Sequence, residues 1–429
     1  MKKASEKLSF ANDVVWSLMF DGGAIVANLV TFILLGRNLG DAGYGAYLGL
    51  FGIIAPLSGL AWAGVGLAAL QQILRDEKDP VEVARRMLGQ GLGTAILVLP
   101  IALVLGSLAI RSLSFAEMFF IMAAELLAVN VVMISANVLQ GTLGIPAASR
   151  LRMLAVVVRL STVLSLFAID SLSIQSIGIL NTALFALLSI WVLKVRLPKA
   201  GIPTWPGKPS RQDTRLAMEF AIPMLGANIQ LDGDKTVLNA YDMEATAGVY
   251  GAAFRVVSLA FTPIRALQAA AHNRLLAKAE ESKGLQVKRS RTFAMINLTA
   301  TIPICLILWF GVELFEPLLG ADFEESARIA RWLLIFLPLK AVSSVPTAGL
   351  LGLGRTTTRA KLNLFTGAVA LILYVVLIPS LSWVGAVIGT IAAEFLLLVL
   401  GIHRLVHWQR VADEAQQVDQ KSDEPLPSV

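Results

Sequence analysis

Charged side chains that interrupt long apolar segments are the residues of this sequence whose types could do chemistry. The cations are Arg159, Lys235, Arg255, Arg265 and Lys340, and the anions are Asp21, Glu125, Asp232, Asp234 and Glu394. A charge within an apolar segment is costly, so such residues pair with one another or line a path for a substrate or an ion. Fixed cations suit a phosphate ligand, whereas buried carboxylates can bind a proton or a metal cation.

Three of the cations are predicted to form one anion-binding site. Lys235 and Arg255 lie on neighbouring apolar segments, and Lys340 lies near the middle of a later one. Arg159 is the next candidate, although its long side chain could instead reach back to the end of its segment. Asp234 and Arg255 lie at similar distances on either side of the intervening loop, so we expect an ion pair between them.

Carboxylates at similar depth are predicted to couple the protein to a cation gradient. These candidates are Asp21, Glu125, Asp232 and Glu394. For Asp21 and Glu394 the alternative is a neutral, hydrogen-bonded carboxyl that only holds helices together. Asn228 is a further candidate for substrate binding, because its spacing of four from Asp232 puts both side chains on one helical face.

The segments around these residues predict an all-α membrane protein. Hydrophobic residues make up 56% of the sequence and charged residues only 15%, which excludes an ordinary soluble enzyme. A helix needs about 20 apolar residues to cross a bilayer. Twelve segments meet this requirement, near residues 14–35, 46–70, 88–110, 115–139, 153–169, 174–193, 217–241, 248–271, 292–318, 329–353, 361–381 and 383–405.

These spans are predicted to form two six-helix lobes. The N-terminal lobe covers residues 1–193 and the C-terminal lobe covers residues 216–405. A basic linker that contains four prolines joins them at residues 194–215. The polar, acidic segment at 406–429 is predicted to be a disordered tail.

An internal repeat supports the division into two lobes. The matched residues are Asp41, Gly45, Tyr47 and Phe51 in the first half and Glu244, Gly248, Tyr250 and Phe254 in the second, at a constant offset of 203 residues. Because each half has six spans, both halves enter the membrane from the same side, as in parallel repeats. Such repeats build two lobes with a cavity between them, which suits alternating access.

Basic residues are distributed in a way that indicates orientation and not nucleic-acid binding. The net charge is +6, but most of the 36 Lys and Arg residues lie at the N-terminus, on every second loop or on the tail. The richest loops are 71–87, 194–215 and 272–291. Loops rich in Lys and Arg remain on the cytoplasmic side, so both termini are predicted to be cytoplasmic.

Other motifs exclude several kinds of chemistry. The single cysteine, Cys305, cannot form an intrachain disulfide or a cysteine metal cluster. The glycines at 201 and 207 have the wrong spacing for a phosphate-binding loop, and Pro209 stands where such a loop needs Ser or Thr. No loop is long enough to hold a catalytic domain, so we expect neither a cofactor nor an enzymatic activity.

Two glycine-rich turns resemble those of a known family. The stretch Asp234-Lys235 is followed after about a dozen residues by Gly248-Val249-Tyr250, and the first turn reads GRNLGDAGYGAY from Gly36 to Tyr47. These turns, the span number and the repeat resemble polysaccharide flippases of the O-antigen type, within the multidrug/oligosaccharidyl-lipid/polysaccharide (MOP) exporter superfamily. The resemblance implies an inner-membrane flippase for a lipid-linked oligosaccharide, carried on undecaprenyl pyrophosphate. It also implies an exchange that is passive or driven by a proton or sodium gradient.

Three alternative functions remain open at this point. A multidrug exporter shares the two-lobe plan but needs an anionic, aromatic-lined cavity for cationic drugs, and aromatic residues are only 7% of this sequence. A lipid II flippase is closer but typically has fourteen spans. A scaffold for a glycan polymerase would not need unmatched interior charges. The expected partners are the lipid-linked glycan, membrane lipids and possible polymerase machinery, without nucleic acid.

Overall fold

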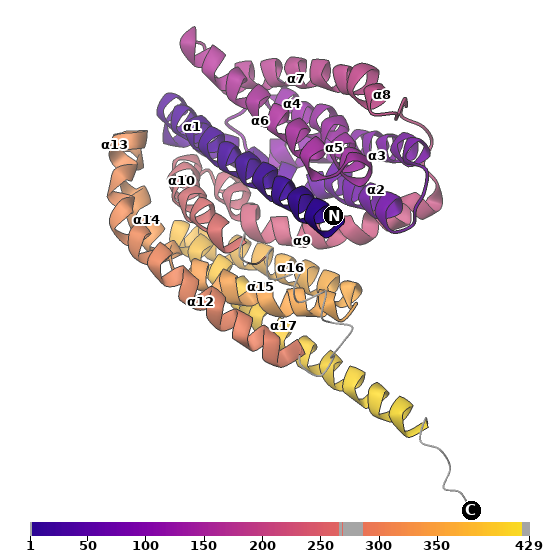
Figure 1. Cartoon of the computed structure of the whole chain (residues 1–429). Helices are drawn as coiled ribbons and strands as arrows, with labels where there is room; N and C mark the ends of the chain where they lie inside the picture. The colour runs from indigo at the N-terminus through magenta and orange to yellow at the C-terminus, as the bar shows by residue number, and fades with distance from the viewer. Residues whose placement is uncertain (1, 266–267, 269–285, 423–429) are drawn as a thin grey trace, which may run out of the picture.

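The computed structural model describes residues 2–265, 268 and 286–422, and the side chains of residues 22–265, 268, 290–314, 317–411 and 414. Helices account for every regular element among these residues. Figure 1 shows the helices of the first half gathered on one side and most of those of the second half on the other. Helices α1, α9 and α10 lie along the junction between the two lobes.

The first lobe consists of eleven helical elements. They are α1 (Lys2–Ser58), η1 (Gly59–Ala63), α2 (Gly64–Leu74), α3 (Pro80–Ala109), α4 (Phe115–Ala123), η2 (Ala124–Ala128), α5 (Val129–Leu143), α6 (Ile145–Ala168), α7 (Ile174–Trp191), η3 (Val192–Arg196) and α8 (Leu197–Lys199). The elements η1, η2 and η3 are short π-helical turns within longer helices.

The second lobe begins after the linker. Its described elements are α9 (Arg211–Ala240), α10 (Glu244–Ala260), α12 (Gln286–Gly311), η5 (Val312–Leu314), α13 (Phe315–Leu319), η6 (Ala321–Phe323), α14 (Glu324–Leu333), α15 (Phe336–Gly352), α16 (Thr356–Leu381) and α17 (Trp383–Ser422). We call the end of the bundle with the turns at 75–79, 200–210 and 353–355 the basic end. The opposite end carries the turns at Gly40, 110–114 and 241–243.

Local sequence signals explain where several helices begin. Asp79 caps α3 by accepting a hydrogen bond from the Glu82 amide, and Pro80 follows at the first helical position. Reciprocal capping boxes start α4 at Ser114, α7 at Ser173 and α9 at Ser210. These side chains satisfy amide groups that would otherwise lack partners at the helix ends.

The number of membrane-crossing helices depends on how the long elements are divided. By length and composition, eight described helical stretches could cross a membrane, or nine if Ala321–Leu333 and Phe336–Gly352, bent by 45°, form one span. This is fewer than the twelve predicted spans. The stretch Gly22–Leu74 counts once but contains two predicted spans, which separate where Gly40 adopts a φ of 67°. Helices α9 and α10 do not qualify, because α9 contains many charged residues and α10 is only 17 residues long.

Two predicted boundaries differ from the structure. The tail that was predicted to be disordered from residue 406 is helical through Ser422, because residues 402–422 of α17 contain no glycine or proline to interrupt the helix. The linker is also shorter than predicted, since α8 reaches Lys199 and α9 already begins at Arg211. It packs against α3, where the Gly207 amide donates to the Arg85 carbonyl at 2.8 Å.

The two lobes meet along a row of small residues on α1 and α2. Gly45, Gly49 and Gly52 face α9 and α10, and Gly64 faces α9 closer to the basic end. Small residues allow helix backbones to approach closely, as is typical of helix contacts in membranes. Polar side chains of α9 bond to the carbonyls that this approach exposes. Thr236 donates to the Gly49 carbonyl at 2.8 Å.

Candidate functional site

A cavity of about 210 Å³ lies between the two lobes. We call it the interlobe cavity. Helices α1 and α6 of the first lobe and α9 and α10 of the second supply its walls. Its lining residues are Asn28, Thr31, Phe32, Leu35, Tyr44, Tyr47, Leu48, Phe51, Ala55, Arg159, Asp232, Lys235 and Arg255.

Arg159 and Glu125 form an ion pair at the first-lobe wall of the interlobe cavity. One guanidinium nitrogen of Arg159 lies 2.6 Å and 2.8 Å from the two Glu125 carboxylate oxygens. Glu125 is 7% exposed and lies on the π-helical turn η2. Sequence reasoning assigned Arg159 to substrate binding and Glu125 to ion coupling, whereas the structure joins them in one pair.

Lys235 points into the core of the second lobe more than into the cavity. Its ammonium lies 3.0 Å from Asp234 and 3.3 Å from Asp232, and it also donates to the Leu231 carbonyl. The ammonium nitrogen also lies 3.8 Å from the centre of the Phe254 ring. Lys235 is only 3% exposed. Two carboxylates and a carbonyl balance its buried charge.

Arg255 differs from the other two cavity cations. It is exposed, and its guanidinium forms no ion pair with a described residue. The predicted pair between Asp234 and Arg255 is therefore wrong. Asp234 instead accepts a 2.6 Å hydrogen bond from the Tyr250 hydroxyl and pairs with Lys235. Equal distance from a loop fixes depth but not the helix face, and Asp234 faces the lobe core whereas Arg255 faces the interlobe cavity.

An aromatic wall is the part of the cavity that sequence reasoning missed. Tyr44, Tyr47 and Phe51 line one face of α1, and Phe32 lies 5.7 Å from Tyr44 between ring centres. The spacings of three and four between Tyr44, Tyr47 and Phe51 could have indicated a shared helical face.

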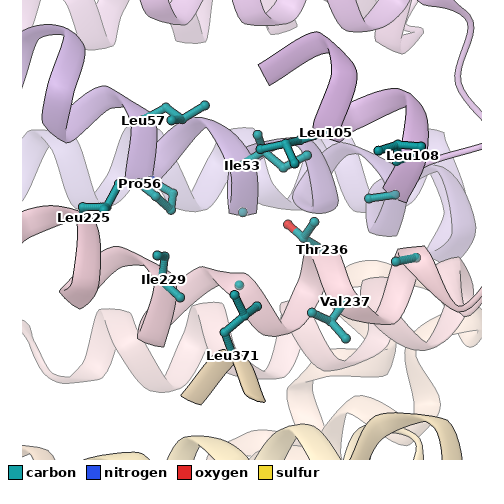
Figure 2. A pocket seen from close by; sticks show the side chains of 14 residues that line it. Ile53, Pro56, Leu57, Leu105, Leu108, Leu225, Ile229, Thr236, Val237 and Leu371 are labelled. Atoms are coloured by element: carbon teal, nitrogen blue, oxygen red, sulfur yellow. The ribbon is translucent and has the colours of Figure 1, made fainter. Parts of the chain in front are cut away.

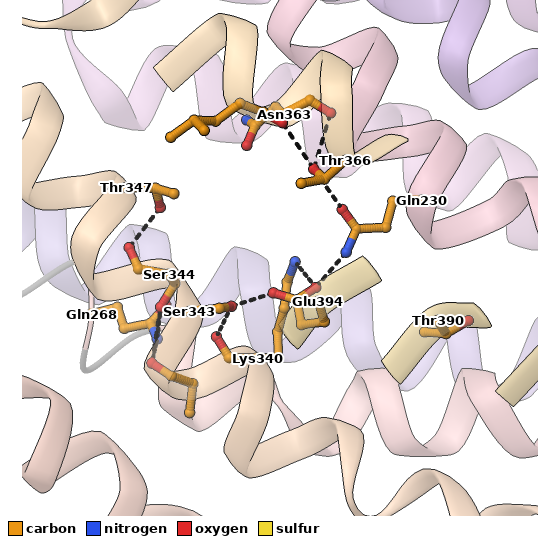
Figure 3. A network of polar contacts seen from close by, with 12 residues as sticks. Gln230, Gln268, Lys340, Ser343, Ser344, Thr347, Asn363, Thr366, Thr390 and Glu394 are labelled. Carbon is orange, nitrogen blue, oxygen red and sulfur yellow. Dashed lines mark hydrogen bonds and ion pairs between the residues drawn. The ribbon is translucent and has the colours of Figure 1, made fainter. Parts of the chain in front are cut away.

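Lys340 lies in a separate polar cluster within the second lobe, which Figure 3 shows. Its ammonium is 3.0 Å from a carboxylate oxygen of Glu394, and that oxygen also accepts from Gln230 at 2.8 Å. Ser343 donates to the other Glu394 oxygen. Glu394 is completely buried, and neither it nor Lys340 lines the interlobe cavity. The structure thus does not bring Lys340 together with Lys235 and Arg255 in that cavity.

A chain of buried polar groups continues from this cluster towards the interlobe cavity. The Tyr374 hydroxyl donates to the Gln230 carbonyl at 2.7 Å and lies 3.0 Å from the Thr390 hydroxyl. Thr390 is in turn 3.5 Å from the Tyr250 hydroxyl, which binds Asp234. This polar chain ends one residue from Lys235, and every hydroxyl in it is fully buried.

The remaining predicted site residues have structural contacts or lie outside the described side chains. The Asn228 amide donates to the Ala55 carbonyl at 2.7 Å, so it joins α9 to α1 and does not line the interlobe cavity. The side chain of Asp21 lies outside the described residues. No group of three or more His, Cys, Asp or Glu side chains among the described residues could hold a metal ion.

A second cavity, almost wholly apolar, opens on another side of the junction between the lobes. It has a volume of about 400 Å³ and is lined by residues of α1, α3, α9 and α16. Figure 2 shows Ile53, Leu105, Ile229 and Leu371 around it, with the Thr236 hydroxyl at its wall. We call it the apolar groove.

The fold matches solved membrane transporters along almost the whole chain. An inward-facing multidrug resistance MATE family transporter of the MOP superfamily is 18% identical, with 90% of this chain and 96% of that chain covered and a TM-score of 0.66. The lipid II flippase MurJ in an inward closed conformation is 12% identical, with coverages of 96% and 94% and a TM-score of 0.70.

A third similar structure is a MOP superfamily transporter from Pyrococcus furiosus, described as having a binding pocket of reverse polarity. It is 16% identical, with 90% of this chain and 96% of that chain covered and a TM-score of 0.60. No curated protein matches this chain in sequence.

These similarities and the two-lobed helical bundle define a multi-pass membrane protein with the fold of MOP-superfamily transporters. Residues 10–265, more than half of the chain, match the family model described as polysaccharide biosynthesis protein. The chain belongs to this polysaccharide biosynthesis protein family. It is therefore a protein of polysaccharide biosynthesis with the fold of MOP-superfamily transporters, and the resemblance noted in its sequence is confirmed for the family and the fold.

Proposed function

We propose that this protein is a flippase that moves a lipid-linked oligosaccharide, carried on undecaprenyl pyrophosphate, across the bacterial cytoplasmic membrane by alternating access. In this proposal both termini are cytoplasmic, because the basic loops concentrate at the basic end. The observation that carries the proposal is Arg255, which lines the interlobe cavity and has no ion-pair partner among the described residues. The family of the chain supports a role in the synthesis of a polysaccharide.

The charges around the interlobe cavity suit an anionic ligand. Arg159 has one carboxylate partner and Lys235 has two, so neither of these cations contributes net positive charge. Arg255 is the cation that can give a pyrophosphate charge-assisted hydrogen bonds without first losing a carboxylate.

The aromatic wall of Tyr44, Tyr47 and Phe51 could stack against sugar rings. The apolar groove offers a volume of about 400 Å³ for part of the prenyl chain.

Replacing Arg255 by alanine is expected to reduce export of the glycan about tenfold or more, because a charge-assisted hydrogen bond to the ligand is lost. Arg255→Lys should recover only part of the loss, since an ammonium cannot grip phosphate through two parallel hydrogen bonds. The measurement is surface glycan per molecule of membrane-inserted protein, together with the amount of lipid-linked precursor that accumulates inside the cell.

Arg265→Ala is the matched control, because Arg265 is exposed, follows α10 and does not line the interlobe cavity. Equal glycan export by Arg255→Ala and the wild-type protein would refute the role of Arg255. Increased drug susceptibility of the Arg255→Ala strain, with normal surface glycan, would favour a multidrug exporter instead.

We further propose that Glu394 couples this transport to a proton gradient. A proton on the Glu394 carboxylate would release Lys340, and the polar chain through Tyr374, Thr390 and Tyr250 connects that event to Lys235 in the interlobe cavity. Glu125 is less suited, because both of its carboxylate oxygens accept from Arg159.

Glu394→Gln is expected to make glycan export independent of the proton gradient, because glutamine resembles the protonated carboxyl in size and can still accept from Gln230. The measurement is the flipping of a labelled lipid-linked glycan in vesicles with and without a proton gradient. Asp232→Asn, which removes the half-exposed carboxylate of the interlobe cavity, is the comparison variant. A Glu394→Gln protein that keeps the wild-type response to the gradient would exclude Glu394 from coupling.

A further inference from the structure

A third pocket lies between α16 and α17 at the basic end of the second lobe, apart from the interlobe cavity. Its volume is about 570 Å³, and its lining residues are Thr358, Lys361, Leu362, Phe365, Leu400, Arg404 and Trp408. None of these residues lines the interlobe cavity or the apolar groove. Helices α16 and α17 pack against each other in this lobe, and Figure 1 shows where the lobe lies. We call this site the α16–α17 pocket.

Two cations of the α16–α17 pocket have no ion-pair partner among the described residues. Lys361 on α16 and Arg404 on α17 are both exposed and both line the pocket. Arg355 lies nearby, with its guanidinium 3.7 Å from the centre of the Trp408 ring. Lys235 and Arg159, by contrast, are balanced by carboxylates. The pocket therefore offers positive charge that is free to bind an anion.

The other wall of the pocket is apolar and extends along the spans. Leu362 and Phe365 lie about one and two turns after Thr358 on α16, and Leu400 lies one turn before Arg404 on α17. Cations therefore lie at the ends of the two spans, whereas apolar side chains lie towards the middle of the membrane. Trp408 is of the aromatic type that favours the boundary between the two regions.

We propose that the α16–α17 pocket binds an anionic phospholipid of the adjoining leaflet. In this site Lys361 and Arg404 hold the phosphate, and an acyl chain lies against Phe365 and Leu400. Basic pockets between membrane helices are suited to acidic head groups, because the cations compensate charge where water is scarce. A soluble phosphate would use the cations alone and leave the apolar wall in contact with lipid. The combination of both walls indicates a lipid ligand.

The test uses the purified full-length protein in detergent and native mass spectrometry, with phosphatidylglycerol and phosphatidylcholine of identical acyl chains as probes. We expect the wild-type protein to retain phosphatidylglycerol preferentially. The double variant Lys361→Ala/Arg404→Ala should bind phosphatidylglycerol on the order of 25-fold more weakly, since each surface cation favours anionic lipid by about fivefold. Phosphatidylcholine binding should change little.

Lys208→Ala/Arg211→Ala is the matched control, because it removes two exposed cations near the same end that do not line the α16–α17 pocket. Phe365→Ala, which alters only the apolar wall, should also weaken phosphatidylglycerol binding. Thermal unfolding of each variant establishes that the fold is kept, as expected for exposed side chains.

Three outcomes would overturn the proposal. Equal losses in the pocket variant and in the Lys208→Ala/Arg211→Ala control would show that binding depends on overall charge. Displacement of phosphatidylglycerol by inorganic phosphate, with no effect of Phe365→Ala, would show a free phosphate site. Loss of polyprenyl phosphate binding with unchanged phosphatidylglycerol binding in the pocket variant would show a site for the carrier lipid.

Discussion

Replacing Gly248 by valine is expected to reduce glycan export at least about fivefold and to hold the opposite end of the lobes apart. A side-chain carbon at Gly248 would lie 1.9 Å from the Asp41 carbonyl oxygen, and one at Gly45 would lie 1.8 Å from the Glu244 carbonyl oxygen. Neither backbone atom can move without the whole helix. Overlap of this kind costs about 1–3 kcal/mol, which shifts a two-state equilibrium about five- to 150-fold.

The contact at Gly45 and Gly248 is reciprocal because these residues are equivalent in the internal repeat. Gly45 approaches Glu244, and Gly248 approaches Asp41, so the same pair of positions meets twice across the junction. An alternating-access protein must open this contact to release substrate at the opposite end and close it again. The glycines allow the closed state, so valine should favour the open one.

Spin labels can measure this separation directly. We suggest cysteines at Asn38 of the first lobe and Glu324 of the second, which are both exposed, in a Cys305→Ala background. The Gly248→Val protein should give a longer distance between the labels than the parent protein. Gly93→Val is the matched control, because a side chain at Gly93 meets no atom within 4 Å. An unchanged distance with normal glycan export would show that the junction does not limit transport.

Removal of the Arg159 guanidinium is expected to destabilise the protein by about 3–5 kcal/mol, because Glu125 would be left as a buried charge without a partner. Glu125 is only 7% exposed, and both of its carboxylate oxygens accept from Arg159. We therefore expect Arg159→Ala to lower the amount of inserted protein and its unfolding temperature in detergent.

The double variant Glu125→Gln/Arg159→Gln separates stability from function. Replacing both charges leaves no unpaired buried ion, so the amount of protein should return towards the wild-type level. Glycan export should stay low if Arg159 also contacts the substrate in the interlobe cavity. Arg111→Ala is the control for losing an ion pair at the surface, since Arg111 and Asp242 are largely exposed, and it should cost at most about 1 kcal/mol. A stable Arg159→Ala protein would contradict the expected cost.

The sequence predicted the helical class and the family correctly, but it predicted the contacts of the charged residues less well. Hydropathy and turn motifs can be recognised from residues that are close together in the sequence. The turn at Gly40 and the repeated glycines Gly45 and Gly248 could therefore be identified before the structure was known. The predicted disorder after residue 406 was wrong because polar composition does not exclude a helix. Lys340 was expected to share a site with Lys235 and Arg255, but it does not line their cavity and pairs with Glu394 instead. The position of a residue along its span does not say which face of the lobe its side chain occupies.

The sequence by itself determined that this chain is an all-helical membrane protein with repeated halves and charges inside its apolar segments. Only the tertiary structure decided which of those charges balance one another. Glu125 meets Arg159 and Glu394 meets Lys340 across 34 and 54 residues of sequence, respectively. Arg255 is left without such a partner among the described residues. Helical spacing fixes the face of one helix, but a partner on another helix depends on how the lobes pack.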